Sequence, residues 1–108
     1  MARVYGRASA SLTAQNTFTD HIHPADKPNK GGLLNLSITG LADSTVTLQR
    51  TFDGGANWAD VVQYTVSDAV NNSVQKVIEA GNEGAEGYRV GIKTGDYGTD
   101  TVVCRLSH

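Results

Sequence analysis

Short segments in which apolar and polar residues alternate are the feature that most constrains the fold of this chain. In residues 34–39, Leu-Asn-Leu-Ser-Ile-Thr, every second side chain is apolar, and residues 88–93 and 101–106 show the same pattern. A period of two is typical of a strand with one buried face, so these segments are predicted to be strands that share a core. The inward-facing residues predicted for the last two segments are Tyr88, Val90, Ile92, Val102, Cys104 and Leu106.

The rest of the sequence also favours an all-β chain. Val and Thr, which are frequent in strands, occur eleven times each. Residues 23–32, which contain both prolines, and the acidic, glycine-rich residues 79–86 are predicted loops. No helix of useful length is expected, although residues 66–77 could include a helical turn. Further strands are predicted at residues 8–12 (an edge strand), 17–22 (with Phe18 and Ile22 on one face), 45–50, 58–65 and 73–78.

The number and spacing of these strands indicate the architecture. A length of 108 residues predicts one domain, residues 1–108. About seven short strands at near-regular spacing, each with one apolar face, are typical of a β-sandwich. We therefore predict an immunoglobulin-like β-sandwich in which the last two strands form a hairpin. A small jelly roll is the alternative.

Residues 51–58, Thr-Phe-Asp-Gly-Gly-Ala-Asn-Trp, are predicted to form the turn of a β-hairpin. Asp53 can accept hydrogen bonds from backbone N–H groups a residue or two on, and the two glycines after it can adopt the positive φ that tight hairpins require. Trp58, the only tryptophan, is expected to fill the core. The spacing of Thr51, Asp53, Gly55 and Trp58 resembles the Asp-box, a hairpin motif repeated in sialidase propeller blades. The resemblance implies a stabilised turn rather than an activity, and a single copy in a chain of this length excludes a propeller.

No pattern in the sequence predicts a catalytic centre. The chain contains neither a Gly-x-Ser-x-Gly nucleophile elbow nor a phosphate-binding glycine loop. Three glutamates, Glu79, Glu83 and Glu86, are expected to form a solvated loop. We therefore expect a protein that is not an enzyme and has no cofactor.

Two pairs of residues have spacings that bear on metal binding. His21 and His23 would share one face of an extended segment, but Asp20 and Asp26 nearby do not define a third ligand, so exposed histidines are expected. Asp96 and Asp100 are expected to cap a turn rather than to bind Ca²⁺.

The charge and hydropathy of the chain limit its partners. The formal net charge is −2 and no basic cluster is present, so nucleic acid is not an expected partner. The first six residues have no apolar signal core and no run is long enough to cross a membrane, so the chain is expected to be made in the cytoplasm. Cys104 is the only cysteine and is expected to fill core space.

Five segments resemble small β-sandwich structural proteins of tailed bacteriophages. The resembling segments are residues 10–18, 36–40, 46–58, 88–97 and 103–107. The resemblance implies a virion component assembled in the host cytoplasm, most typically a capsid decoration (cement) protein that binds the major capsid protein. It also implies a homo-oligomer, with a homotrimer favoured by the three-fold positions of a capsid.

Two other functions stay open. One is a structural part of the tail or neck. The other is a carbohydrate-binding module for host attachment, which usually needs several exposed aromatic residues. Tyr5, Tyr64 and Tyr97 are the available tyrosines, and they are scattered along the chain.

The N-terminal residues 1–13 are predicted to form an arm that is too poor in apolar residues to anchor strongly in its own sandwich. In an extended arm Arg3, Tyr5 and Arg7 would point to one side, and Arg and Tyr often carry binding energy at interfaces. We expect this arm to contact a neighbouring copy or the capsid protein. A frayed terminus is the alternative, and residues 23–32 are the next candidate for the contact.

Overall fold

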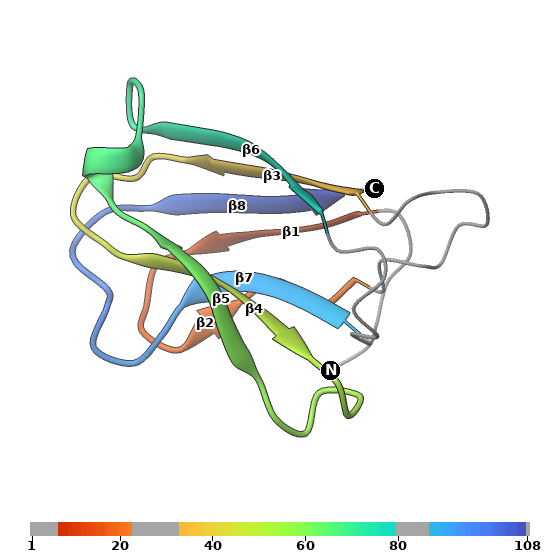
Figure 1. Cartoon of the computed structure of the whole chain (residues 1–108). Coiled ribbons are helices and arrows are strands. Elements are labelled where there is room, and N and C mark those ends of the chain that lie inside the picture. Colours follow the sequence, from red (N-terminus) through yellow and green to blue (C-terminus); the bar gives the residue numbers. More distant parts are fainter. Residues whose placement is uncertain (1–6, 23–32, 80–86, 108) are drawn as a thin grey trace.

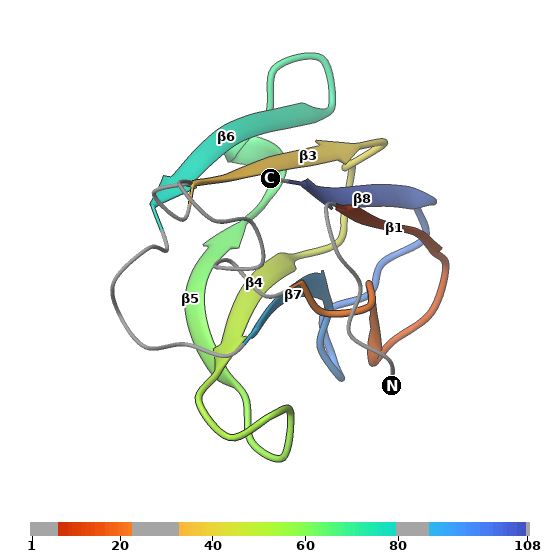
Figure 2. The ribbon, with the colours of Figure 1, turned by 90° about the vertical axis from the view of Figure 1, so that its right-hand side faces the viewer.

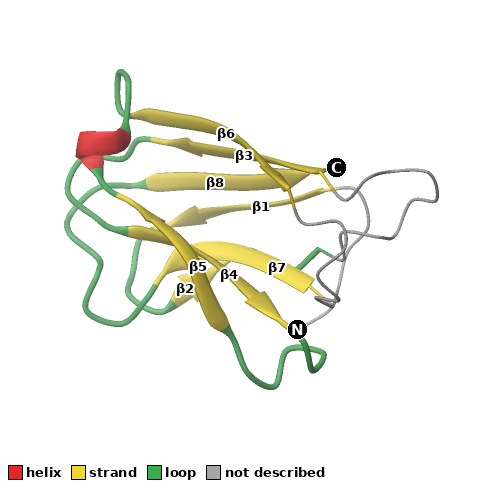
Figure 3. Cartoon of the chain, in the orientation of Figure 1, coloured by secondary structure: helices red, strands yellow, loops and turns green. Residues whose placement is uncertain are grey.

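The computed structural model describes residues 7–22, 33–79 and 87–107 of the chain. Within these residues eight strands form two four-stranded sheets that face each other (Figures 1 and 2). Strand and loop colouring shows no helix other than one short 3₁₀ turn, Val66–Asp68, in the described segments (Figure 3). The strands are β1 (Arg7–Leu12), β2 (Thr17–Phe18), β3 (Leu33–Thr39), β4 (Val46–Thr51), β5 (Ala59–Tyr64), β6 (Ser73–Glu79), β7 (Gly87–Ile92) and β8 (Val102–Ser107).

The strand order is that of a jelly roll. One sheet has the order β1-β8-β3-β6 and the other the order β2-β7-β4-β5. The antiparallel pairs β1–β8, β2–β7, β3–β6 and β4–β5 describe one long hairpin that has been rolled up, with the β4–β5 turn at its tip. The predicted all-β sandwich is confirmed. Its strand order is that of the small jelly roll, which was the alternative, so the prediction of an immunoglobulin-like order is wrong. The predicted hairpin of the last two strands is wrong, because β7 and β8 lie in different sheets.

The core lies between the sheets and is built by the predicted alternation. All six residues that the last two segments were predicted to turn inward are buried, as are Leu34, Leu36 and Ile38 of β3. Cys104 is a free, buried thiol, and burial raises its pKa to about 12. The prediction for Phe18 and Ile22 is wrong, because Ile22 is in the core while Phe18 lies beneath the guanidinium of Arg89 on the outer side of its sheet. The chain between them is held by separate contacts to β7, so it does not keep one strand's alternation.

Two loops that are distant in the sequence are tied together at one end of the sandwich. The Asp100 carboxylate accepts hydrogen bonds from the backbone N–H groups of Ala42, Asp43 and Ser44 at 2.7, 3.0 and 3.2 Å and from the Ser44 hydroxyl. Asp43 in turn accepts from the Thr99 hydroxyl at 2.6 Å. Burial raises the pKa of Asp100, but these donors outweigh it and hold the pKa below its usual value. Asp100 therefore caps the β3–β4 loop rather than the turn at residues 95–100 that it was predicted to cap, and it joins that loop to the β7–β8 loop.

The N-terminal strand corrects the prediction of a detached arm. Arg7–Leu12 pairs with β8 along its whole length, and Ala8 and Leu12 are buried. The arm prediction is therefore wrong for residues 7–12, whose small residues suffice for an edge strand, and the separate prediction of an edge strand at residues 8–12 is confirmed. Arg3 and Tyr5 lie outside the described residues. In the described segments no helix has the length and hydropathy required for a bilayer crossing.

Candidate functional site

The predicted Asp-box turn joins β4 to β5 at the tip of the rolled hairpin. The Thr51 hydroxyl accepts the Gly55 N–H at 2.9 Å and donates to the Asp53 carboxylate at 2.7 Å. Asp53 accepts the side-chain and backbone N–H groups of Asn57 at 2.8 and 2.9 Å. These bonds from Asn57, followed by that from Thr51, lower the pKa of Asp53 to about 2. The turn is stabilised by Asp53, as expected, but through a residue four positions on rather than one or two.

Trp58 does not fill the core, which corrects the sequence prediction. Its indole Nε1 donates to the Gly55 carbonyl oxygen at 3.1 Å, and its ring is half-buried on the outer side of the β2-β7-β4-β5 sheet. The ring lies there because Trp58 ends the turn and immediately precedes β5, where the hydrogen bond to Gly55 folds the indole back over the sheet. The indole therefore packs on the outside of the sandwich.

Arg89 is held between two aromatic rings on this outer side. Its neighbours in β7, Tyr88 and Val90, point into the core, so the Arg89 side chain projects outward. The guanidinium carbon lies 3.9 Å from the ring centre of Phe18 and 4.2 Å from that of Trp58. Burial lowers the pKa of Arg89 from its usual value, and cation–π contacts with the two rings stabilise the cation in place.

A row of polar side chains fixes the orientation of Arg89. Its Nε donates to the side-chain oxygen of Gln49 at 2.9 Å, and the Gln49 amide donates to Asp60 at 2.9 Å. Lys93 donates to the other oxygen of Asp60 at 2.6 Å. The hydrogen bonds from Lys93 and Gln49 lower the pKa of Asp60, and the bond to Asp60 raises the pKa of Lys93. Arg89, Gln49 and Asp60 are direct cross-strand neighbours, so the sheet register itself assembles the row.

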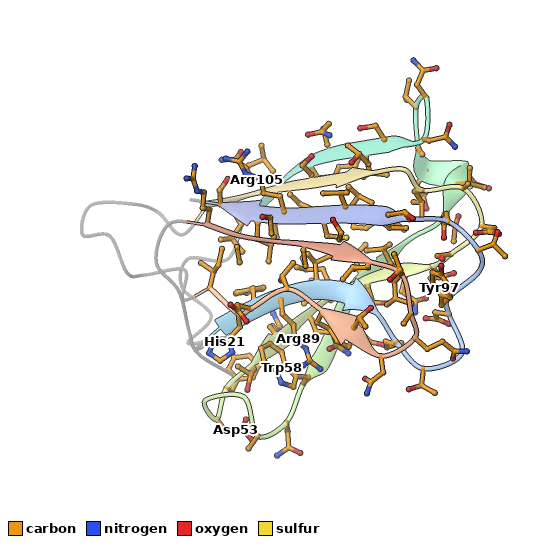
Figure 4. All side chains as sticks on the ribbon, turned by 180° about the vertical axis from the view of Figure 1, so that it is seen from behind. His21, Asp53, Trp58, Arg89, Tyr97 and Arg105 are labelled. Carbon is orange, nitrogen blue, oxygen red and sulfur yellow. The ribbon has the colours of Figure 1, made fainter. Side chains whose placement is uncertain are left out.

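A small pocket opens beside the guanidinium. It has a volume of about 110 Å³ and is lined by His21, Gly54, Gly55, Trp58 and Arg89. The rings of His21 and Trp58 lie 5.5 Å apart. Figure 4 shows His21, Trp58 and Arg89 close together, above the turn that carries Asp53 in this view. We call these five residues the Arg89 pocket.

The histidine prediction is partly corrected here. His21 is 7% exposed instead of solvent-facing, because its ring packs over Gly87 at the start of β7. His23 and Asp26 lie outside the described residues. No group of three or more His, Cys, Asp or Glu side chains that could hold a metal is found in the described segments.

The opposite sheet presents a different outer face. Its outward positions form three rows across four strands, and half of these positions carry a serine or threonine. The three rows contain twelve positions, and none of them is Asp or Glu. The paired residues Leu33, the first of β3, and Glu79, the last of β6, lie outside these rows. We call these twelve positions the hydroxyl face. The rows are Arg7, Ser107, Asn35 and Val77; Ser9, Arg105, Ser37 and Gln75; and Ser11, Val103, Thr39 and Ser73.

The hydroxyl face is hollowed near Arg105. A depression of about 440 Å³ lies there, with Asn35, Ser37 and Gln75 among its lining residues. The Gln75 amide donates to the hydroxyls of Ser37 and Ser73, both at 2.9 Å, so part of the hollow is already ordered. Arg105 projects from this sheet, on the opposite side of the sandwich from Arg89 (Figure 4).

Comparisons of the chain with protein families, curated proteins and solved structures give no match.

The structure brings together some predicted residues and separates others. Thr51, Asp53 and Gly55 form one turn, and Trp58 closes it. Arg7 lies on the hydroxyl face and not in a free arm. Sequence reasoning missed Arg89 as a site residue, although a signal was present.

The missed signal is the pair of glycines that flanks Arg89 in β7. A Cβ atom at Gly91 would lie 2.6 Å from the Cα atom of Phe18, and one at Gly87 would lie 3.0 Å from His21 Cδ2. Glycine inside a strand often marks the close approach of another segment. Both glycines leave room for the segment that carries Phe18 and His21, so Arg89 projects between those two side chains.

Proposed function

We propose that this chain is a structural protein of a tailed-bacteriophage virion, of the capsid decoration type, and that it binds the major capsid protein through its hydroxyl face. The proposal combines the sequence resemblance with the character of that face. One observation decides the choice of face. The outer surface of this sheet is hollowed, and its three rows contain two arginines and no acidic residue.

Charge supports a protein partner with carboxylates on its surface. The chain as a whole has a formal charge of −2, whereas Arg7 and Arg105 make the hydroxyl face positive. Opposite potentials on two partners accelerate association and fix their register. Serine and threonine hydroxyls both donate and accept hydrogen bonds, so they can adapt to polar groups on the partner.

The size of the face favours several simultaneous contacts. Four strands about 4.8 Å apart and six residues of about 3.4 Å each give a face of about 400 Å². A stable protein interface usually covers about 800 Å² on each partner. The hydroxyl face is therefore expected to act with neighbouring copies, and the homotrimer remains our proposal for the assembled state.

A tail or neck component would use the same face, and the number of copies in the virion distinguishes it from a decoration protein. The carbohydrate-binding alternative finds less support. Tyr64 is 6% exposed and Tyr97 packs against the core, so neither offers an open sugar platform. Tyr5 lies outside the described residues.

The test compares arginine variants from the two sheets in their binding to capsids that lack this protein. Removing the charge of Arg105 and Arg7 together, as R7Q/R105Q, is expected to weaken binding at least tenfold without lowering the melting temperature. Lys93→Gln, which removes one positive charge just after β7 of the other sheet, is the control and is expected to bind like the wild type. Equal binding by the double variant and the control would reject the hydroxyl face. No binding of the wild-type protein to any virion shell would reject the proposed function.

A further inference from the structure

We propose that the Arg89 pocket binds a carboxylate group. The site lies on the sheet opposite the hydroxyl face and does not depend on the proposed function. The ligand is either a small organic acid or the side chain of an Asp or Glu on a partner protein, because both present the same planar anion.

The first argument is that Arg89 is a half-buried cation whose charge is not matched by a carboxylate among the described residues. In residues 7–22, 33–79 and 87–107 its partners are the Gln49 oxygen and the rings of Phe18 and Trp58. Asp60, the carboxylate of the polar row, is bonded to Lys93 and Gln49 instead. A buried charge is costly unless it is paired, and a guanidinium has five N–H donors of which Gln49 takes one. An anion in the pocket would supply the missing partner.

The second argument is that the guanidinium is already fixed. Contacts with two aromatic rings restrict its movement, and the bond to Gln49 sets its rotation. Gln49 is 6% exposed and is itself held by Asp60, so the support is rigid. A group held in its bound conformation loses little entropy when a ligand arrives. This is the arrangement expected of a binding group.

The third argument is the size and chemistry of the pocket. Its volume of about 110 Å³ holds about three to four waters at about 30 Å³ each. That space suits a carboxyl group with one or two carbons behind it. The planar fork of an arginine matches the two oxygens of a carboxylate, and the ring of His21 forms another wall. One arginine suits a monoanion better than a phosphate dianion, which proteins usually meet with several cations or a helix N-terminus.

The experiment uses the single tryptophan as the reporter. The fluorescence of Trp58 and the NMR signal of its indole N–H are followed during titration with sodium acetate, with sodium chloride replaced to keep the ionic strength constant. A saturable change is expected for the wild type. Arg89→Gln is expected to weaken the response at least tenfold, whereas Arg105→Gln, on the other sheet, is expected to respond like the wild type.

A second titration identifies the source of the carboxylate. A short peptide with one central glutamate and blocked ends is compared with the same peptide carrying glutamine. Binding of the glutamate peptide at least tenfold tighter than acetate indicates a protein side chain, and equal binding indicates a small acid. Since Arg89→Gln could disturb the fold, Arg89→Lys is measured beside it. The lysine variant keeps the positive charge but lacks the planar guanidinium that can bond both carboxylate oxygens, so it is expected to bind more weakly than the wild type. The proposal is overturned if acetate and the glutamate peptide both give no saturable change, if chloride gives the same change, or if the folded Arg89 variants respond like the wild type.

Discussion

Asp53 links the geometry of the turn to the dependence of stability on pH. Its pKa falls from 3.8 to about 2 in the folded chain because Asn57 and Thr51 donate hydrogen bonds to the charged carboxylate. A group with a lowered pKa contributes stability that is complete above its unfolded value and is lost as the pH falls through its folded value. The contribution of Asp53 is therefore present above about pH 4 and lost towards about pH 2.

The test of this linkage is Asp53→Asn, which has no charge to titrate. Denaturant midpoints are measured for both proteins at several pH values between about 5 and 2. The wild type is expected to be more stable at the upper end, with the difference shrinking as the pH falls. A difference that stays constant over the range would show that the lowered pKa does not contribute to stability.

A second prediction concerns Trp58. Because its indole lies outside the core, Trp58→Ala is expected to lower the free energy of unfolding by less than the loss of a core tryptophan would. Trp58→Ala loses one hydrogen bond of about 1 kcal/mol and a cation–π contact of about 0.5–1 kcal/mol. We expect a loss of about 2 kcal/mol, against about 3–5 kcal/mol for a tryptophan in a core. Leu48→Ala, a buried position in the same sheet, is the comparison in denaturant unfolding. A loss from Trp58→Ala larger than that from Leu48→Ala would place the indole in the core after all.

The strands show what alternation can and cannot predict. The alternation of apolar and polar residues identifies which side chains of β3, β7 and β8 are buried, because the side to which each residue points depends only on the pleat of its own strand. It does not identify the neighbouring strand. Residues 93–101 could have turned back as a hairpin. Instead they cross to the other sheet, and within this crossing Asp100 is hydrogen-bonded to Ser44 of the β3–β4 loop, 56 positions away in the sequence. Contacts over such separations are not visible in a local pattern.

A substitution at Gly91 tests the close packing of β2 against β7. Gly91→Ala would place a Cβ atom against the backbone of Thr17 and Phe18. It is expected to lower the melting temperature and to speed hydrogen exchange at the Thr19 amide, which is bonded to the Val90 carbonyl at 2.9 Å. Gly95→Ala is the control, because its φ of +92° strains an alanine but nothing lies within 4 Å. Equal effects of the two substitutions, with unchanged exchange at Thr19, would contradict the close packing.

The complete sandwich explains why its surfaces were harder to predict than its strands. The hydroxyl face draws its rows from β1, β8, β3 and β6, which span residues 7 to 107. The Arg89 pocket likewise combines residues from β7, the turn between β4 and β5 and the segment after β2. Arg7 was predicted to bind a partner, but Arg105 and Arg89 were not, because their importance arises only when the sheets form. The proposed function depends on the sequence resemblance for the kind of assembly and on the fold for the face.

The number of copies in purified virions tests the central proposal most directly. Particles that contain this chain are denatured, and its amount is measured against the major capsid protein by quantitative mass spectrometry. A decoration protein is expected in a fixed ratio to the capsid protein, on the order of hundreds of copies per particle. About a dozen copies or fewer, as in a ring of the tail or neck, or none at all, would contradict it.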